Sequence, residues 1–281
     1  MMSLLSAHTV SHGYRRFSLL GPSHYQPVLN DVSMNIERGE TLALLGRSGC
    51  GKSTLARLLI GLENPTRGEV RFEGKPLNSL SQADQRALRC AVQMVFQDSI
   101  SAVNPRKTVG EIIAEPLRHL TDMTAEQQNR RVAALLESVE LSAGDAQKHP
   151  AAMSGGQLQR VCIARALAPK PSLVILDEAV SNLDLLLQIQ TLDLLRGLQE
   201  KSGVSFLFIT HDLRLVERFC SRVMVMDGGR IVEETAVYGR VRLEHPASKQ
   251  LQDAILPAWP KGYVNPARVG KTDRQPMVAN L

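Results

Sequence analysis

The sequence TLALL at residues 41–45 is followed directly by GRSGCGKS at 46–53. The first stretch is continuously apolar, which is typical of a central strand buried on both faces. The second fits the phosphate-binding pattern G-x-x-x-x-G-K-[ST]. Leucines at helical spacing then predict a helix over 52–62 that stops near Pro65. A buried strand, a glycine-rich loop and a helix in this order predict an α/β core that binds phosphate.

The glycine-rich loop has a clear chemical purpose. Its glycines let backbone N–H groups turn toward phosphate oxygens, and the start of the following helix adds partial positive charge. Lys52 is placed to reach the β- and γ-phosphates, Ser53 to ligate Mg²⁺, and Thr54 to add a phosphate contact. We therefore expect ATP or GTP to contact Gly46, Arg47, Ser48, Gly49, Cys50, Gly51, Lys52 and Ser53. The alternative is a glycine-rich turn that binds no ligand.

Length and composition indicate a protein with a sizeable core and argue against a membrane-spanning or exported chain. The chain has 281 residues, of which 43% are hydrophobic and 4% aromatic, so it can bury a sizeable aliphatic core. Its net charge of +5 does not choose between nucleotides, membranes and nucleic acids. No apolar run is long enough for a spanning helix, and we see no export signal, which makes a cytoplasmic location the default. The four cysteines lack C-x-x-C spacing, so free thiols are expected, without disulfides or a metal.

Two carboxylates follow a second apolar strand, LVIL at 173–176. Beside a phosphate-binding loop, Asp177 is placed to hold Mg²⁺ and Glu178 to act on water beyond the γ-phosphate. His211 comes two residues after another apolar strand, SFLFI at 205–209, where it could sense the γ-phosphate. A solvated acidic turn and an ordinary polar histidine are the alternatives.

A second candidate anion site begins at Ser154. Ser154 is a plausible N-cap, and Gly155, Gly156 and Gln157 then open a helix that carries apolar residues to Leu167. Further strands are expected at 32–36, 69–73, 92–96 and 223–226, and helices between 108 and 168. From about Pro257 a proline- and glycine-rich composition predicts a loose tail.

Taken together and in this order, the motifs resemble those of the ATP-binding-cassette (ABC) ATPases over roughly residues 4–235. The resemblance identifies Gln97 as a loop glutamine that ligates Mg²⁺ and takes part in catalysis, Asp184 as a D-loop residue and His211 as a switch histidine. It implies an α/β P-loop NTPase (RecA-like) core with an antiparallel β subdomain and an inserted helical subdomain. We expect an ABC ATPase domain over 4–240, with core and β subdomain over 4–95 and 160–240 and the helical subdomain over about 97–159. Residues 241–281 would be a short C-terminal extension.

In that family the nucleotide is clamped between two subunits arranged head to tail. The resemblance therefore implies that Ser154, Gly155, Gly156, Gln157 and Asp184 contact the nucleotide across a dimer. It also makes Tyr14 the candidate for stacking on adenine, with Tyr25 as the second choice and ordinary surface packing as the alternative for either ring. The cofactors implied are ATP and Mg²⁺.

Other segments resemble the peptide and nickel importer branch of these ATP-binding subunits. They are QMVFQD at 93–98, NPRKTV at 104–109 and the His245-Pro246 pair. The segments QDSISAVNPR at 97–106 and DEAVSNLD at 177–184 are similar to those of nickel import subunits. The seven scattered histidines give nickel no independent support, so an importer of dipeptides or oligopeptides stays open. The implied partners are a paralogous ATPase subunit, two transmembrane permease subunits and a periplasmic substrate-binding protein, with no nucleic acid. The implied location is peripheral, on the cytoplasmic face of the inner membrane.

Two other functions are alternatives, an ATPase acting on DNA or ribosomes and a binding module without turnover. The stretch between Lys52 and Ser154 is too short for a long coiled coil, and Glu178 argues for turnover. Separately, Cys50 lies at a helix start two residues before Lys52, which predicts a lowered thiol pKa and a reactive thiol. The alternative is that Cys50 fills an unconstrained position.

Overall fold

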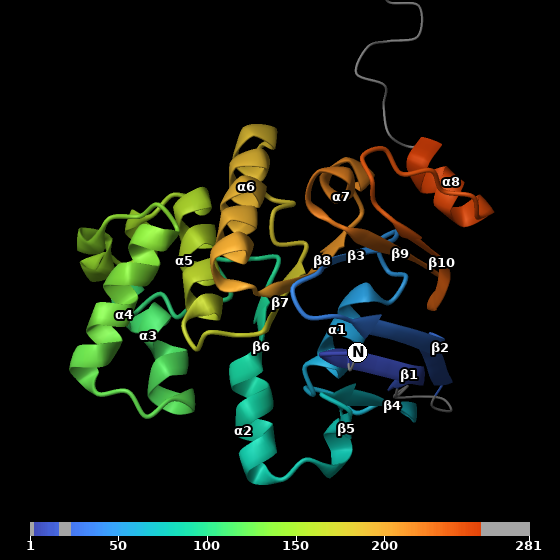
Figure 1. Ribbon diagram of the computed structural model, residues 1–281, viewed down its shortest axis with the longest axis horizontal. Helices are drawn as coiled ribbons and strands as arrows, with labels where there is room; N and C mark the ends of the chain where they lie inside the picture. The colour runs from blue at the N-terminus through green and yellow to red at the C-terminus, as the bar shows by residue number, and fades with distance from the viewer. Residues whose placement is uncertain (1–2, 17–23, 254–281) are drawn as a thin grey trace, which may run out of the picture.

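The computed structural model describes residues 3–16 and 24–253 (Figure 1). In chain order its strands and α-helices are β1 (Leu5–Arg16), β2 (His24–Ile36), β3 (Thr41–Leu45), α1 (Lys52–Leu59), β4 (Arg67–Phe72), β5 (Lys75–Pro76), α2 (Gln82–Ala91), β6 (Val92–Val95), α3 (Val109–Leu120), α4 (Ala125–Ser138), α5 (Gly155–Leu167), β7 (Leu173–Asp177), α6 (Leu185–Ser202), β8 (Ser205–Thr210), α7 (Leu213–Phe219), β9 (Arg222–Asp227), β10 (Arg230–Ala236) and α8 (Pro246–Asp253). Short 3₁₀ turns lie at Leu77–Ser79, Ala143–Gln147 and Pro150–Ala152. The α/β class predicted from the sequence is confirmed.

The larger sheet has six strands in the order β10-β9-β3-β8-β7-β6. All pairs are parallel except β9 with β10, and β3 is buried along its whole length, as its apolar run predicted. The register pairs Leu45 with Thr210 and Asp177 with Ile209. Because parallel strands end at one edge, the loops after β3, β7 and β8 meet there.

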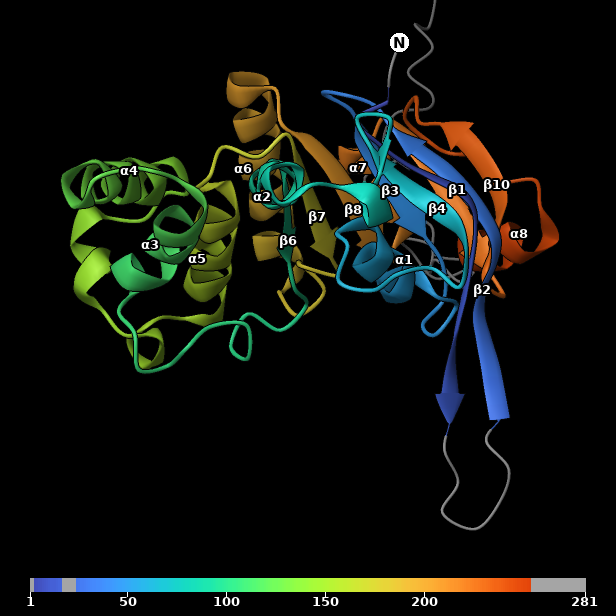
Figure 2. The ribbon, with the colours of Figure 1, turned by 90° about the horizontal axis from the view of Figure 1, so that it is seen from below.

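The smaller sheet is antiparallel, in the order β2-β1-β4-β5. Successive residues of β3 pack on opposite faces of the larger sheet. Leu42 and Leu44 join a core shared with α1 and the small sheet, whereas Ala43 and Leu45 join a core shared with the helices. Figure 2 shows α1 beside the small sheet and the group α3 to α5 at the other end of the molecule. The phosphate loop and the helix opened by Ser154 therefore belong to different parts of the fold.

Several boundaries differ from those predicted. The helix that starts at Lys52 ends at Leu59, because Gly61 is left-handed with φ 71°. The segment 32–36 is the end of the longer strand β2, and α2, β10 and α8 were not predicted. The proposed subdomain boundary at residue 159 falls inside α5, which runs on to Leu167 and packs on α3. The tail expected from Pro257 lies outside the described residues. Among those residues no helix combines the length and apolarity needed to cross a membrane.

Candidate nucleotide-binding and hydrolysis site

The phosphate loop needs glycine at two positions for its shape. Gly49 and Gly51 have φ of 79° and 111°, which side chains rarely tolerate. A Cβ on Gly51 would also lie 2.8 Å from a methyl carbon of Leu29 and 3.2 Å from the carbonyl oxygen of Val28. Gly51 caps α1, whose first turn carries no acidic side chain. The loop therefore presents backbone amides and a helix start to an anion.

Lys52 is held inside this loop. Its Nζ donates hydrogen bonds to the carbonyl oxygens of Gly46 at 2.8 Å and Arg47 at 2.9 Å. The side chain is 5% exposed, and Nζ lies 4.0 Å from Oε1 of Glu178. The ammonium group is thus fixed at the mouth of the loop, with a carboxylate opposite.

Ser53 and Asp177 come together from α1 and β7. The hydroxyl of Ser53 donates to Oδ1 of Asp177 at 3.2 Å. Burial raises the pKa of Asp177 above its ordinary value, and the hydrogen bond from Ser53 opposes this. A hydroxyl beside a carboxylate offers the hard oxygen ligands that Mg²⁺ prefers, so the two residues fit a magnesium site.

Glu178 is positioned by its backbone as well as its neighbours. Its N–H donates to the carbonyl oxygen of Ile209 at 3.0 Å, and its φ of 47° is left-handed. The carboxylate Oε1 lies 3.6 Å from Nδ1 of His211, on the loop after β8. The structure therefore gathers Lys52, Glu178 and His211 at one edge of the sheet.

The helix opened by Ser154 lies elsewhere. Ser154 caps α5 as predicted: its Oγ accepts from the amide of Gln157 at 3.2 Å, and Oε1 of Gln157 accepts from the amide of Ser154 at 2.9 Å. Asp184 caps α6, accepting from the amide of Leu187 at 3.0 Å. A Cβ on Gly156 would lie 3.4 Å from a methyl carbon of Leu187, so the start of α5 lies next to the start of α6. The predicted contact residues Gly156 and Asp184 therefore belong to neighbouring helix starts. Figure 1 shows α5 and α1 on opposite sides of β7, so the chain does not bring its two anion sites together.

The two tyrosines lie on opposite faces of the small sheet. The Tyr14 hydroxyl donates at 2.8 Å to Oε2 of Glu63, which lies just beyond the end of α1. The Tyr14 ring packs edge-on against the ring of His12, with 5.1 Å between the ring centroids. The Tyr25 ring crosses Gly13, where a Cβ would lie 2.8 Å from it. Since neighbouring side chains of a strand alternate, only Tyr14 is on the α1 side. Tyr14 is 39% exposed.

The prediction that Cys50 has a lowered thiol pKa is wrong. Cys50 is buried, and burial raises the pKa of its thiol although the charge of Lys52 opposes the shift. All four cysteines are free. The sequence indicated the helix start and the lysine, but the burial of Sγ arises from packing against neighbours distant in sequence.

Some contacts of the site were not predicted at all. Arg47 donates from Nη2 to Oε1 of Gln250 at 2.8 Å, which brings α8 to the phosphate loop. Asn182 donates from Nδ2 to the backbone oxygen of Gln97, whose own side chain is exposed. The sequence offered no signal for either pair beyond the polar character of the four residues.

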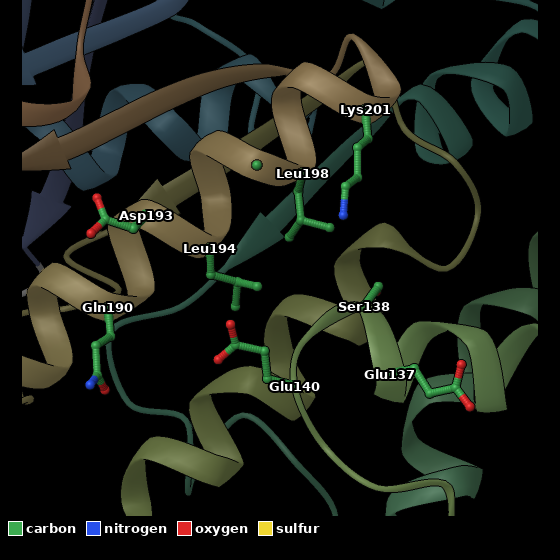
Figure 3. Close-up of a pocket in the computed structure, with 9 residues that line it drawn as sticks. Glu137, Ser138, Glu140, Gln190, Asp193, Leu194, Leu198 and Lys201 are labelled. Atoms are coloured by element: carbon green, nitrogen blue, oxygen red, sulfur yellow. The ribbon is translucent and has the colours of Figure 1, made fainter.

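A cavity of about 550 Å³ lies away from these residues, between α6 and the end of α4 (Figure 3). Leu194, Leu198 and Lys201 of α6 line it on one side, and Glu140 points toward Leu194 from the other. None of the predicted site residues lines it. The candidate site is therefore the sheet edge rather than this cavity.

Comparison with known proteins agrees with this geometry. Residues 29–181 match the ABC transporter family, over a range that includes the phosphate loop, Ser154 and Glu178, and the chain belongs to that family. It is 61% identical over 260 residues to the nickel import ATP-binding protein NikE of Rhodospirillum rubrum, covering 92% of this chain and 94% of the relative. The NikE protein of Escherichia coli strain K12 is 55% identical over 259 residues, covering 92% and 97%.

Among solved structures, one similar chain is the ATP-binding cassette MJ0796 in a dimeric post-hydrolysis state bound to ADP and Pi. The TM-score is 0.74 with 29% identity, covering 84% of this chain and 100% of that one. The ABC ATPase fold and the family resemblance inferred from the sequence are confirmed.

Proposed function

We propose that this chain is the ATP-hydrolysing subunit of an ABC import complex that energises nickel uptake through partner permeases. The observation that supports ATP hydrolysis is the gathering of Lys52, Glu178 and His211 at one sheet edge, next to Ser53 and Asp177. Nickel as the cargo rests on the similarity to NikE proteins. An importer of dipeptides or oligopeptides is the alternative within the same branch.

In the proposed mechanism, the loop from Gly46 to Gly51 donates amides to the phosphates, and Lys52 neutralises charge on the β- and γ-phosphates. Ser53, Asp177 and the side chain of Gln97 would hold Mg²⁺, which neutralises the developing charge when bound. Glu178 orients the attacking water and accepts its proton, while His211, 3.6 Å away, holds the carboxylate toward the γ-phosphate. Thr54 adds a phosphate contact, and Tyr14 stacks on the adenine.

The separation of α5 from α1 supports a site completed by a second cassette. Ser154, Gly155, Gly156, Gln157 and Asp184 of this chain then contact the nucleotide held by the partner. Closing two helix starts on one nucleotide excludes water and strengthens each charge contact. We propose a paralogous partner subunit, two transmembrane permeases and a periplasmic substrate-binding protein, with the chain peripheral on the cytoplasmic face of the inner membrane.

The test is nickel accumulation in nickel-limited cells whose only change is Lys52→Ala in this chain. Loss of uptake that is rescued by the wild-type gene is the expected result, because the phosphates lose their main cationic contact. Lys201→Ala is the matched control, since Lys201 is exposed on α6 and lies outside the site. Normal nickel uptake with lost dipeptide uptake would instead favour the peptide importer.

A further inference from the structure

The loop between β7 and α6 holds Glu178 in an unusual conformation. Glu178 has φ 47°, a backbone region that L side chains rarely adopt. Its carbonyl oxygen accepts two hydrogen bonds from Ser181, one from the amide at 3.0 Å and one from the hydroxyl at 2.8 Å. The turn that presents Glu178 is thus closed by Ser181.

The next residue reaches a different loop. Asn182 donates from Nδ2 to the backbone oxygen of Gln97 at 3.2 Å, across 85 positions of sequence. Gln97 follows β6, and Val95 of that strand pairs with Leu176 of β7, so the two loops leave adjacent strands. Asn182 therefore joins the loop of the proposed magnesium ligand Gln97 to the loop of Glu178.

The loop that carries Asn182 is itself fixed. Gln188 of α6 donates from Nε2 to the carbonyl oxygens of Val180 at 3.2 Å and Leu183 at 3.1 Å. Asp184 caps the helix that follows. The backbone on both sides of Asn182 is therefore hydrogen-bonded, and the exposed side-chain amide of Asn182 extends from this fixed turn to the backbone oxygen of Gln97.

The loop of Gln97 is held from two different parts of the fold. Further along this loop, Arg165 of α5 donates to the carbonyl oxygen of Ala102 at 2.6 Å. Sγ of Cys162, also on α5, lies 3.7 Å from the carbonyl oxygen of Ser99. Ser99 and Ala102 are thus bonded to α5, whereas Gln97 is bonded to Asn182 in the loop after β7. Gln97 already lies two residues beyond Val95 of β6, and the Asn182 bond adds a second connection between this part of the loop and the sheet core.

We propose that Asn182 is a positioning residue that holds the backbone of Gln97 where its exposed side chain can reach a magnesium ion held by Ser53 and Asp177. The inference rests on the proposed ATPase function. Asn182 acts through Gln97 and does not touch the reacting atoms. Its role is therefore distinct from those of Glu178 and His211.

The experiment uses the assembled complex and measures ATPase rate against both ATP and Mg²⁺ for Asn182→Ala. Losing one hydrogen bond of ordinary strength should lower kcat about fivefold to tenfold and raise the Mg²⁺ concentration for half-maximal activity by a similar factor. The KM for ATP at saturating Mg²⁺ should change less than about twofold, because Asn182 makes no contact that binds ATP itself. Asn182→Asp, which keeps the shape but removes the donor, should behave in the same way.

The controls separate positioning from a general loss of structure. Asn129→Ala removes an exposed asparagine of α4 and should match the wild type. In a Gln97→Ala background, Asn182→Ala should cause no further loss, because the side chain that it positions is already absent. Equal losses in both backgrounds, or an unchanged Mg²⁺ dependence, would overturn the role of Asn182. A wild-type complex without Mg²⁺-dependent ATPase activity would instead overturn the proposed function.

Discussion

Glu178 lies between a cation and an imidazole. Its Oε1 is 4.0 Å from Nζ of Lys52 and 3.6 Å from Nδ1 of His211, and its side chain is 18% exposed. A carboxylate in this position can accept a proton from water while its neighbours limit its motion. At the scale of single residues, the site is therefore defined by three side chains that follow three different strands, β3, β7 and β8.

Glu178→Gln should leave ATP binding intact and slow hydrolysis by about 10² to 10⁴. The amide keeps the shape of the side chain but cannot accept the proton. ATP binding and single-turnover hydrolysis by the complex measure the two effects separately. Glu137→Gln, on an exposed residue at the end of α4, is the matched control and should be silent. Unchanged turnover in Glu178→Gln would remove this residue from the base role.

Three helices of this protein begin with the same N-terminal capping motif. Thr108, Thr124 and Ser154 each form a capping box with the side chain three residues on, at α3, α4 and α5. Such caps stabilise a helix wherever it lies, so their presence alone does not indicate a ligand site. What distinguishes α5 is the pair of glycines that follows its cap, and a Cβ on Gly155 would meet nothing within 4 Å.

Thr124→Ala and Ser154→Ala should each lower the free energy of unfolding by about 1 kcal/mol, because each removes a capping hydrogen bond. Only Ser154→Ala should also lower ATPase activity of the complex, since only α5 is proposed to face a nucleotide. Urea denaturation of the chain and activity of the complex measure the two effects. Equal activity losses in both variants would indicate that the cap of α5 acts through stability alone.

The cap of α7 predicts a pH dependence. Asp212 accepts from the amide of Arg214 at 2.9 Å. Burial raises the pKa of Asp212, but the hydrogen bonds and charge of Arg214 outweigh it, so the pKa lies below its ordinary value. The charged form is thus favoured in the folded state, and its contribution is present above about pH 4 and lost as the pH falls through the folded pKa.

Asp212→Asn keeps a capping side chain but removes the charge. It should therefore destabilise the protein near pH 7, and the difference from wild type should shrink as the pH falls below about 4. Urea midpoints across this pH range provide the measurement. A difference that stays constant with pH would show that the carboxylate charge contributes nothing to stability.

At the scale of the whole molecule, one arginine joins the two sheets. Arg222 of β9 donates to Glu40 at 2.8 Å and to the backbone oxygen of Asn35 in β2 at 2.6 Å, and it also pairs with Glu234 of β10. The side chains of Arg222 and Glu40 are only 20% and 14% exposed. Removing the guanidinium would leave a largely buried carboxylate without its cation.

Because this pair is partly exposed, Arg222→Ala should lower the free energy of unfolding by about 2 kcal/mol, between the cost for an exposed pair and that for a fully buried one. The control is Arg130→Ala on α4, whose pair with Glu126 is 69% and 79% exposed and should cost less than about 0.5 kcal/mol. Urea denaturation compares the two variants directly. Similar losses would mean that the junction between the sheets contributes no more than an exposed ion pair.

Much of this protein follows from local sequence. The apolar run at 41–45 and the pattern at 46–53 defined a buried strand and a phosphate loop, because burial on both faces and glycine geometry are properties of short segments. Asp177, Glu178 and His211 could likewise be placed at strand ends. The order of these motifs along the chain then carried the resemblance that identified the family.

The tertiary structure decided the rest. It set the burial that raises the pKa of Cys50, the left-handed backbone of Glu178 and the bond from Asn182 to Gln97. These depend on which strands become neighbours, and β7 lies beside both β8, the next strand along the chain, and β6, from which α3, α4 and α5 separate it in sequence. Periodicity indicates which face of an element is buried, but only the completed sheet determines which loops meet at its edge.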